Sequence, residues 1–494
     1  MNNPRVLVLS LFGAISVSAQ TEVLTRGPYL QSCSSTSIVI RWRTDLGVNS
    51  EVHYGTNSTN LDRVQTLPGN RTEHEVRIAG LSADTKYYYS VGSSSHVLAV
   101  STNHFFSTSP TTIKSTRIWA IGDFGWADGG AGMVRDSYAT YSQGLPTDVW
   151  LMLGDNYYVG VQRAIFDFYP DFLRNTCFWP TLGNHDITPV EGAGIYTDAF
   201  TLPTGGQCGG VPSNSELYYS FNHANIHFVV LDSTSTGRAT NGVMLQWLEQ
   251  DLSAVDADWL IAIWHHPPYT KGSHDSDVQV ESIDMRQNAV PILERYGVDL
   301  VLSGDSHVYE RSFFINGHYG PSPTFNASMK VQAGSGRTNE TGAYTKPIGR
   351  AGADRGTIYI VMGCSARGDV RYGLNHPAMY FGNAAIGSVV IDVNGNRLDA
   401  KMLVGFAPYP INDYFTIIKT GSRSPKLQIS RVGSEARVSW PTNTAAFMLQ
   451  SVARITQSNT WSAVTNGMMT NNGENVVNVP FNGTNQFFRL QSSP

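Results

Sequence analysis

Five short polar motifs lie in order along the middle of the chain, and each begins at or soon after a run of apolar residues. The first follows the apolar run 117–121, and the last follows the run 300–303. Glycine or proline beside polar residues is typical of the tight turns in which strands end. The motifs are Gly122-Asp123-Phe124-Gly125, Gly154-Asp155-Asn156-Tyr157-Tyr158, Gly183-Asn184-His185-Asp186, His265-His266-Pro267-Pro268-Tyr269 and Gly304-Asp305-Ser306-His307.

The apolar runs in this region alternate with stretches of helical periodicity, which favours a layered α/β domain. Helices are expected at 243–252 and 289–296. Open α/β sheets bind ligands in the crevice outside the carboxyl ends of their strands, so the five motifs are expected to converge there. Strands are expected at 117–121, 149–153, 178–182, 226–231, 259–264 and 300–303.

Short alternating runs on both sides of this region predict two further β domains. Residues 21–110 are expected to form a β-sandwich, with Trp42 in its core. Within them, the stretch 81–87 resembles the turn and tyrosine corner of fibronectin type III-like domains. Residues 425–494 predict a small C-terminal β-sandwich. The expected fold class is therefore multidomain, with a central α/β domain at 113–418 between two β-sandwiches.

The N-terminal residues 1–19 resemble a secretory signal peptide. Arg5 supplies the positive charge, residues 6–15 are apolar, and small residues allow cleavage after Ala19. The apolar stretch is shorter than a bilayer requires, and no other segment reaches that length. The protein is expected to be secreted or periplasmic, without a membrane span.

Charge and cysteine content narrow the possible partners further. The formal net charge is −5 and no stripe of Lys and Arg is present, so nucleic acid is not an expected partner. Four cysteines allow three pairings in an exported chain. Cys177 and Cys208 form the most plausible disulfide because both lie in one insertion.

The polar motifs contain the ligand types that hard metal ions require, namely carboxylate, amide, phenolate and imidazole groups. Asp123 can bind one ion, and Asp155 can bridge two ions with its two oxygens. Tyr158 points to Fe(III), because a phenol normally loses its proton only to a strongly Lewis-acidic ion. Any one motif is compatible with an ordinary turn, but the ordered set predicts a two-metal phosphoesterase. The remaining amide and imidazole donors are Asn184, His265 and His307.

These motifs resemble those of the purple acid phosphatases, a family of the metallophosphoesterase superfamily whose plant-type members carry a fibronectin-like domain before the catalytic one. The resemblance covers the motifs from Asp123 to Arg311. It implies a four-layer α/β catalytic domain and a dinuclear centre of Fe(III) plus a divalent ion, Fe, Mn or Zn. The implied ligands are Asp123, Asp155, Tyr158 and His307 for iron, and Asp155, Asn184, His265 and the residue at position 305 for the second ion.

The chain departs from the family pattern Gly-His-x-His at Asp305. Aspartate is itself a competent ligand, so Asp305 is expected to bind the second ion with a shorter reach and an added negative charge. The alternative is a weak second site with reduced activity. That charge favours Mn(II), Fe(II) or Mg(II) over zinc. His266 can compete with His265 as the ligand, and the resemblance favours His265.

The resemblance also implies residues for acid–base chemistry and substrate binding. His185 corresponds to a histidine that contacts substrate and assists the leaving group, and His274 corresponds to another substrate-facing histidine. The neighbour of the latter, often also histidine in the family, is Asp275 here.

Three arginines and a tyrosine have weaker expected roles. Tyr309 and Arg311 are expected to brace the loop that carries His307. Arg337 or Arg367, if near the site, is a candidate phosphate clamp.

The expected function is that of an exported acid phosphatase acting on small-molecule phosphomonoesters. A metal-bound hydroxide would attack phosphorus, and His185 or His274 would protonate the leaving group. One alternative is a phosphodiesterase on the same metals. The other is a non-catalytic secreted surface or adhesion protein with a degenerate site, for which Asp275 and Asp305 are the supporting features. The natural substrate and the oligomeric state are not determined by the sequence.

Overall fold

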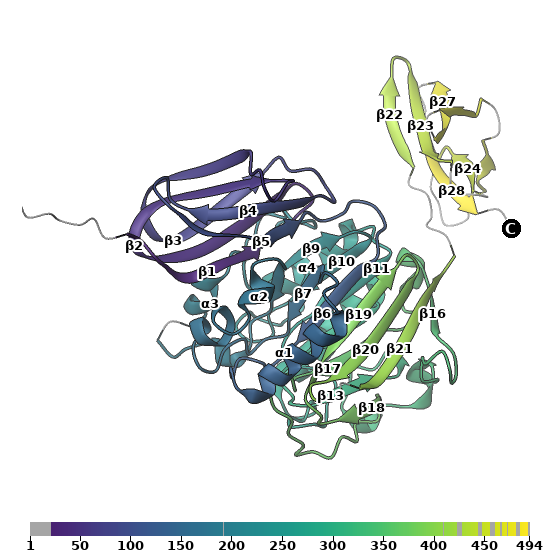
Figure 1. The fold of residues 1–494 in the computed structure, drawn as a ribbon. Helices are drawn as coiled ribbons and strands as arrows, with labels where there is room; N and C mark the ends of the chain where they lie inside the picture. Colours follow the sequence, from purple (N-terminus) through teal and green to yellow (C-terminus); the bar gives the residue numbers. More distant parts are fainter. Residues whose placement is uncertain are drawn as a thin grey trace, which may run out of the picture.

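A computed structural model describes most of the chain from residue 21 onward (Figure 1). The expected signal peptide at 1–19 lies outside the described residues. Within the described part, no helix combines the length and apolar character needed to cross a membrane. The described ranges are 21–190, 192–408, 410–421, 427–442, 447–454, 460–464, 467–471, 473–480 and 485–492.

The N-terminal strands form a five-stranded antiparallel sheet. The strands are β1 (Leu24–Gln31), β2 (Ser37–Gly55), β3 (Arg63–Ala79), β4 (Lys86–Gly92) and β5 (Val97–Ser107). The long β2 joins them into one sheet, because its first half pairs with β1 and its second half with β4. Trp42 is fully buried and stacks on His74 at 4.7 Å between ring centroids. The Tyr87 hydroxyl accepts a hydrogen bond from the Ser82 amide, the contact of a tyrosine corner.

Two seven-stranded sheets form the central domain, and the strands expected from the sequence are all present in them. The first sheet has the order β16 (Tyr344–Pro347), β21 (Ile411–Thr420), β20 (Arg397–Val404), β19 (Gly387–Asn394), β6 (Thr116–Ile121), β7 (Val149–Met152) and β8 (Phe178–Pro180). The second has the order β18 (Met379–Asn383), β13 (Tyr309–Ser312), β17 (Ile358–Met362), β12 (Leu300–Ser303), β11 (Trp259–Ile263), β10 (Ile226–Val230) and β9 (Tyr219–His223). Strands β6 to β8 are parallel, as are β10, β11, β12 and β17.

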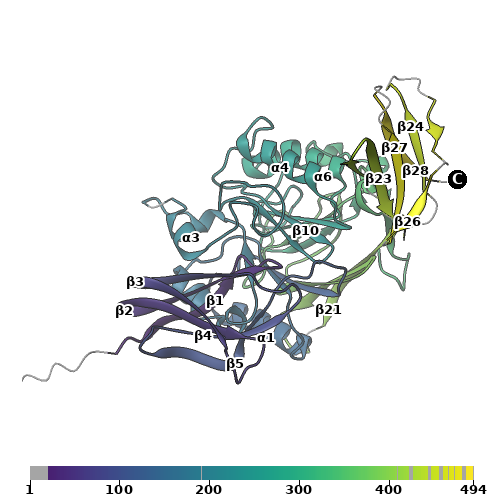
Figure 2. The same ribbon diagram turned by 90° about the horizontal axis from the view of Figure 1, so that it is seen from above.

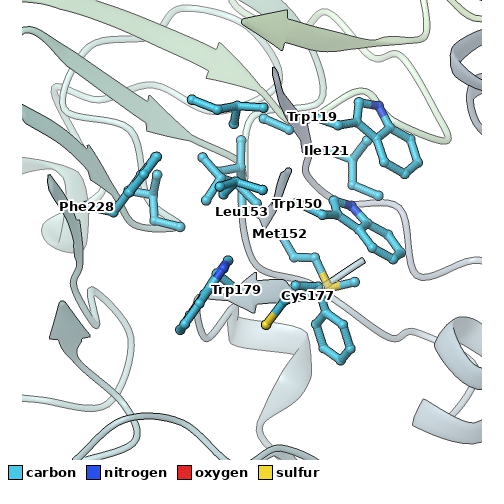
Figure 3. Close-up of a cluster of buried hydrophobic side chains, with 14 of the residues drawn as sticks. Trp119, Ile121, Trp150, Met152, Leu153, Cys177, Trp179 and Phe228 are labelled. Carbon is cyan, nitrogen blue, oxygen red and sulfur yellow. The ribbon is translucent and has the colours of Figure 1, made fainter. Parts of the chain in front are cut away.

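An apolar core joins the two sheets. Trp179 of β8 stacks on Phe221 of β9 at 3.7 Å, and Phe221 stacks on Phe228 of β10 at 4.5 Å. Figure 3 shows Trp179 and Phe228 among the buried apolar side chains of this core. Side chains of a strand alternate between the two faces of its sheet, so Ile261 and Ile263 of β11 contribute to this core while Ala262 between them faces away from it.

Helices cover the outer faces of both sheets and complete the four layers. The helix α1 (Gly129–Ser142) packs on the first sheet, where Tyr138 stacks on Trp119 at 4.3 Å. The helices α4 (Val243–Ala254) and α6 (Val290–Tyr296) cover the second sheet and lie side by side in Figure 2. Other short helices and strands are α2 (Pro170–Leu173), α3 (Gly194–Ala199), α5 (Val280–Asp284), β14 (Phe314–Ile315) and β15 (Lys330–Gln332).

The described C-terminal residues form two small sheets with a common core. Val438, Trp440, Leu449 and Val477 are buried between them. One sheet has the order β22 (Gln428–Val432), β23 (Glu435–Pro441), β27 (Glu474–Pro480) and β26 (Met469–Asn471), and the other β25 (Ser462–Ala463), β24 (Phe447–Val452) and β28 (Phe487–Ser492).

The expected disulfide between Cys177 and Cys208 is not formed in the structure. All four cysteines are buried free thiols. Burial raises the pKa of both Cys177 and Cys208, because a thiolate is poorly solvated in apolar surroundings. Since thiol–disulfide exchange proceeds through attack by the thiolate, this environment slows oxidation of the two side chains.

Candidate metal centre

The polar motifs meet where the carboxyl ends of strands from the two sheets come together. Asp123 follows β6, Tyr158 follows β7 and Asn184 follows β8, all in the first sheet. His265 follows β11 and His307 follows β12 in the second sheet. The paired edges of two parallel sheets therefore bring together side chains that are almost two hundred residues apart in sequence.

Three aspartates of these motifs adopt left-handed backbone conformations. The φ angle is 55° at Asp123, 50° at Asp155 and 63° at Asp305. Such angles are uncommon outside glycine, and each costs of order 1–3 kcal/mol unless the surrounding structure enforces it. The same turn recurs after β6, β7 and β12, and each time it directs a carboxylate to the same place.

A first group of ligand atoms gathers around Asp123. The Tyr158 hydroxyl lies 3.2 Å from Asp123 Oδ1 and 2.7 Å from Asp155 Oδ2. His307 Nε2 lies 3.4 Å from Asp123 Oδ1. These are the four residues expected to hold the first ion.

A second group gathers around His265. Its Nε2 atom lies 3.0 Å from Asn184 Oδ1, 3.3 Å from Asp155 Oδ1 and 3.8 Å from Asp305 Oδ1. Its Nδ1 atom lies 2.8 Å from the Leu153 carbonyl oxygen. These contacts leave Nε2 directed toward the other expected ligands of the second ion.

The separations within both groups fit donors that share a metal ion. With metal–donor distances of about 2.0–2.2 Å, two donors on one ion can lie up to about 4.4 Å apart. Asp123, Asp155 and Asp305 are all at least 96% buried, and their ion pairs in the described residues are with histidines only. Asp305 Oδ2 is buried without a hydrogen-bond partner. Concentrated buried negative charge of this kind is costly unless cations balance it.

The protein alone holds several of these groups in unusual protonation states. Burial raises the pKa of Tyr158, and the charges of Asp123 and Asp155 raise it further. Burial by itself would lower the pKa of His265, but Asp155, Asp123 and Asp305 raise it to about 9. Without a cation, Tyr158 stays a phenol and His265 holds a proton, so both would release protons on binding a metal.

The two histidines expected to act on substrate lie at the exposed rim of this cluster. The side chain of His185 is 56% exposed, and its Nε2 is 3.9 Å from Asp155 Oδ2. His274 is 41% exposed on its side chain, and its Nδ1 is 3.9 Å from Asp305 Oδ2. Both rings are therefore open to solvent while lying next to the expected metal ligands.

Other expected contacts turn out differently. Asp275 is engaged by Lys271, with 2.5 Å between Oδ1 and Nζ. Tyr309 and Arg311 do not brace the His307 loop; both bind the buried carboxylate of Asp413 on β21, at 2.9 Å and 2.5 Å. A buried strand residue has its partners fixed by the facing sheet, which a linear motif does not reveal.

Both candidate phosphate clamps already pair with carboxylates, and the partner of Arg367 is Asp128, at 3.1 Å. Arg337 is bound by Asp413 at 2.9 Å and by Glu340 at 2.8 Å. The guanidinium of Arg367 lies 3.6 Å from the ring centroid of Trp126, which in turn stacks on Tyr158. The sequence around Trp126 indicates no more than an ordinary loop, yet the indole covers one face of a predicted metal ligand.

Asp186 is a site residue that sequence reasoning missed, although it stands in the third motif. Its carboxylate accepts hydrogen bonds from the amides of Asn156, Tyr157 and Gly183 at 2.8, 3.2 and 2.8 Å. Burial, followed by the charge of Asp155, raises the pKa of Asp186 to about 8. The residue ties the loop after β7 to the loop after β8. Its position two residues after the predicted ligand Asn184 is the sequence feature that could have identified Asp186.

Comparison with known proteins gives matches over both regions. Residues 116–309 match the calcineurin-like phosphoesterase family model, and residues 28–108 match that of the purple acid phosphatase N-terminal domain. Purple acid phosphatase 23 of Arabidopsis thaliana is 33% identical over 48% of this chain and 57% of its own length. Phosphoenolpyruvate phosphatase of Allium cepa is 26% identical over 65% of this chain and 70% of its own length.

The matches to the curated relatives cover only part of their length. The chain spans about half to two thirds of the Arabidopsis relatives that it matches, with 57%, 49% and 65% of three of them covered. Among solved structures, the purple acid phosphatase PPD1 of yellow lupin (Lupinus luteus) is 15% identical, with a TM-score of 0.65 over 80% of this chain and 75% of that one. At this identity the structural match concerns the fold.

Proposed function

Because this chain is a metallophosphoesterase of the purple acid phosphatase type, we propose that it hydrolyses phosphate monoesters at a dinuclear metal centre. The proposed ligands of the first ion are Asp123, Asp155, Tyr158 and His307, and those of the second are Asp155, Asn184, His265 and Asp305. We propose His185 and His274 as the residues that act on substrate.

One observation carries the proposal, namely the position of Asp155 between the two ligand groups. Its Oδ2 lies 2.7 Å from the Tyr158 hydroxyl, in the first group. Its Oδ1 lies 3.3 Å from His265 Nε2, in the second group. A carboxylate that turns one oxygen toward each of two donor sets has the arrangement needed to bridge two ions. A single structural cation would not require the two oxygens of Asp155 to face different sets of donors.

The protein's own residues then have defined tasks. When two ions are bound, they neutralise the phosphate charge, activate a water molecule and hold the reacting groups in line. The backbone amide of His185 donates to Asp155 Oδ1 at 2.8 Å, so the loop that offers the imidazole to substrate is anchored on the bridging carboxylate. An imidazole at this rim can bind a phosphate oxygen and pass a proton to the leaving alkoxide. His274, which lies next to Asp305, can likewise bind a phosphate oxygen and protonate the leaving group.

The ligand types support Fe(III) at the first position and a divalent transition ion at the second. Tyr158 is the only donor of its kind in the two groups described above, and its raised pKa means that a strong Lewis acid is needed to remove its proton. The second group combines an imidazole with amide and carboxylate oxygens, which suits Fe, Mn or Zn.

Phosphomonoesters are the proposed substrate class, and the proposed location is outside the cytoplasm. One relative, from Allium cepa, is named a phosphoenolpyruvate phosphatase, and its substrate is a monoester. The signal-like residues 1–19 support secretion or a periplasmic location.

Phosphate release from p-nitrophenyl phosphate by the metal-loaded protein tests the proposal. Asp155→Asn and Asn184→Ala are each expected to lower kcat/KM by about 100-fold or more, because ligand loss weakens metal binding and activity together. Asp136→Asn, a change at an exposed carboxylate on α1, serves as the matched control and should leave the rate unchanged.

Three results would overturn the proposal. The first is undiminished turnover in Asp155→Asn and Asn184→Ala. The second is purified protein that neither contains nor takes up metal, which would leave the surface-protein alternative. The third is a faster rate on bis(p-nitrophenyl) phosphate than on the monoester, which would identify a phosphodiesterase at the same site.

A further inference from the structure

We propose that His266 is an additional ligand of the second metal ion, so that this ion is held by two adjacent histidines together with Asp305. The inference rests on the proposed dinuclear function and extends it to a residue outside the expected ligand set. The donor set would then be Asp155, Asn184, His265, His266 and Asp305.

Geometry is the first argument. His266 Nε2 lies 3.8 Å from Asp305 Oδ1, the same separation as that between His265 Nε2 and Asp305 Oδ1. The ligand atoms of all three residues lie within 4.8 Å of one another. Asp305 Oδ1 thus stands between two imidazoles at distances that donors on one ion adopt.

The orientation of the His266 ring is the second argument. A histidine that binds metal almost always has its other ring nitrogen hydrogen-bonded, because that contact fixes the ring and its tautomer. His265 Nδ1 is held by the Leu153 carbonyl oxygen at 2.8 Å. His266 Nδ1 is held by Ser233 Oγ, also at 2.8 Å, and Ser233 Oγ further accepts the His266 amide at 3.0 Å. Both rings have Nδ1 anchored and Nε2 turned toward Asp305.

The state of Asp305 is the third argument. A histidine at position 305 could reach the ion by itself, but a carboxylate has a shorter side chain. Asp305 is 96% buried, its backbone is in the left-handed region, and its Oδ2 has no hydrogen-bond partner. A buried carboxylate is costly unless a cation balances its charge. An ion shared with His266 and His265 would balance the charge and restore a second imidazole to the site.

This assignment changes which ion is expected. An aspartate in place of a histidine would favour hard ions, Mg(II) among them. Two imidazoles with three oxygen donors instead favour a divalent transition ion, because Mg(II) prefers an all-oxygen environment. Two adjacent anchored rings therefore select Mn, Fe or Zn over Mg.

Binding of Mn²⁺ and the number of histidine nitrogens on it provide the test. Full-length protein labelled with ¹⁵N-histidine is loaded with Mn²⁺ alone, and pulsed electron paramagnetic resonance counts the imidazoles on each bound ion. The wild type should have two at the second position, and His266→Ala should have one and bind Mn²⁺ at that position about 100-fold more weakly. The first position should keep its tyrosinate absorption when loaded with iron.

Two further variants keep the test decisive if His266→Ala folds poorly. Ser233→Ala leaves the ring in place but removes its anchor, and should weaken Mn²⁺ binding by about 10-fold. The double variant His266→Ala with Asp305→His returns an imidazole from another position and should recover most of the affinity. His53→Ala, at a half-exposed histidine of the N-terminal sheet, is the control and should change nothing.

The inference would be overturned if the second-position Mn²⁺ of the wild type had one imidazole ligand, or if Mn²⁺ affinity were unchanged in both His266→Ala and Ser233→Ala. Either result would leave the proposed dinuclear phosphatase function unaffected. A wild type that binds no metal would instead remove the proposed function itself. The two failures are therefore distinguishable.

Discussion

A Cβ atom placed on Gly154 would lie 2.3 Å from Nδ1 of His265. Gly154 begins the loop after β7 in the first sheet, whereas His265 follows β11 in the second. The loop of one sheet thus touches the ring of a predicted ligand carried by the other. Absence of a side chain at position 154 lets the two groups of ligands approach each other.

Gly154→Ala should therefore weaken the second metal position. The methyl group must displace the His265 ring from the Leu153 carbonyl, and an alanine at the observed φ of 90° is strained by about 1 kcal/mol or more. Metal content per chain and thermal unfolding measure the two effects. Gly160→Ala is a matched control, because Gly160 has a φ of 88° and an added Cβ there would have no atom within 4 Å. Equal metal content in the two variants would contradict the steric explanation.

Tyr158→Phe should abolish the visible absorption of the iron-loaded protein. The substitution removes the phenol oxygen that lies 2.7 Å from Asp155 and keeps the ring that stacks on Trp126 at 4.2 Å. Because the ring packing remains, the melting temperature of the metal-free protein should change by only a few degrees. Tyr372→Phe, at a tyrosine that is 46% exposed, should leave the spectrum intact. A visible absorption band that persists in Tyr158→Phe would show that the absorption comes from a group other than Tyr158.

Glu310→Gln should make stability less dependent on pH. Burial raises the pKa of Glu310 from 4.5 to about 7. Between those two pH values the unfolded chain binds fewer protons at this site than the folded chain. The contribution of Glu310 to the unfolding free energy is therefore fully present below about pH 4.5. It is lost as pH rises through about 7, and the total loss is about 3 kcal/mol.

The neutral glutamine side chain cannot ionise, so the difference in unfolding free energy between Glu310→Gln and wild type should increase from pH 4.5 to pH 8. Urea unfolding at several pH values measures it. Glu249→Gln, at a glutamate on α4 whose side chain is 46% exposed, is the control. Parallel stability curves for Glu310→Gln and wild type would show that Glu310 ionises normally in the fold.

Asp413→Ala should destabilise the catalytic domain strongly. The Asp413 carboxylate is fully enclosed and binds Arg311 at 2.5 Å and Arg337 at 2.9 Å. Removal of one partner leaves the buried Arg311 guanidinium uncompensated, which typically costs about 3–5 kcal/mol. Urea unfolding of the metal-free protein measures the loss, with Asp136→Ala as the exposed control. A change below about 1 kcal/mol would mean that water replaces the carboxylate.

Periodicity and motif order predicted much of this protein correctly. Apolar runs such as 117–121 and 259–264 carry the period and length of buried strands, and these properties are local. The polar motifs follow those strands directly, so their placement at strand ends could be inferred without a structure. The same local signals identified Trp42 as a core residue and Tyr87 as part of a tyrosine corner.

Partners across the two sheets could not be inferred in this way. Arg311 stands near His307 in sequence, yet its partner is Asp413, a hundred residues away in the facing sheet. The cysteine pairing failed for a related reason, because proximity in sequence says little about which thiols meet in a packed core.

The sequence by itself determined the order and chemical nature of the proposed metal ligands, because strand periodicity and ligand chemistry are properties of short segments. Only the tertiary structure decided which oxygen of Asp155 faces which group, and that His266 is turned toward Asp305 with Ser233 behind it. Those relationships depend on how two sheets pack against each other. Packing is set by contacts between residues that are distant in sequence, which no local pattern records.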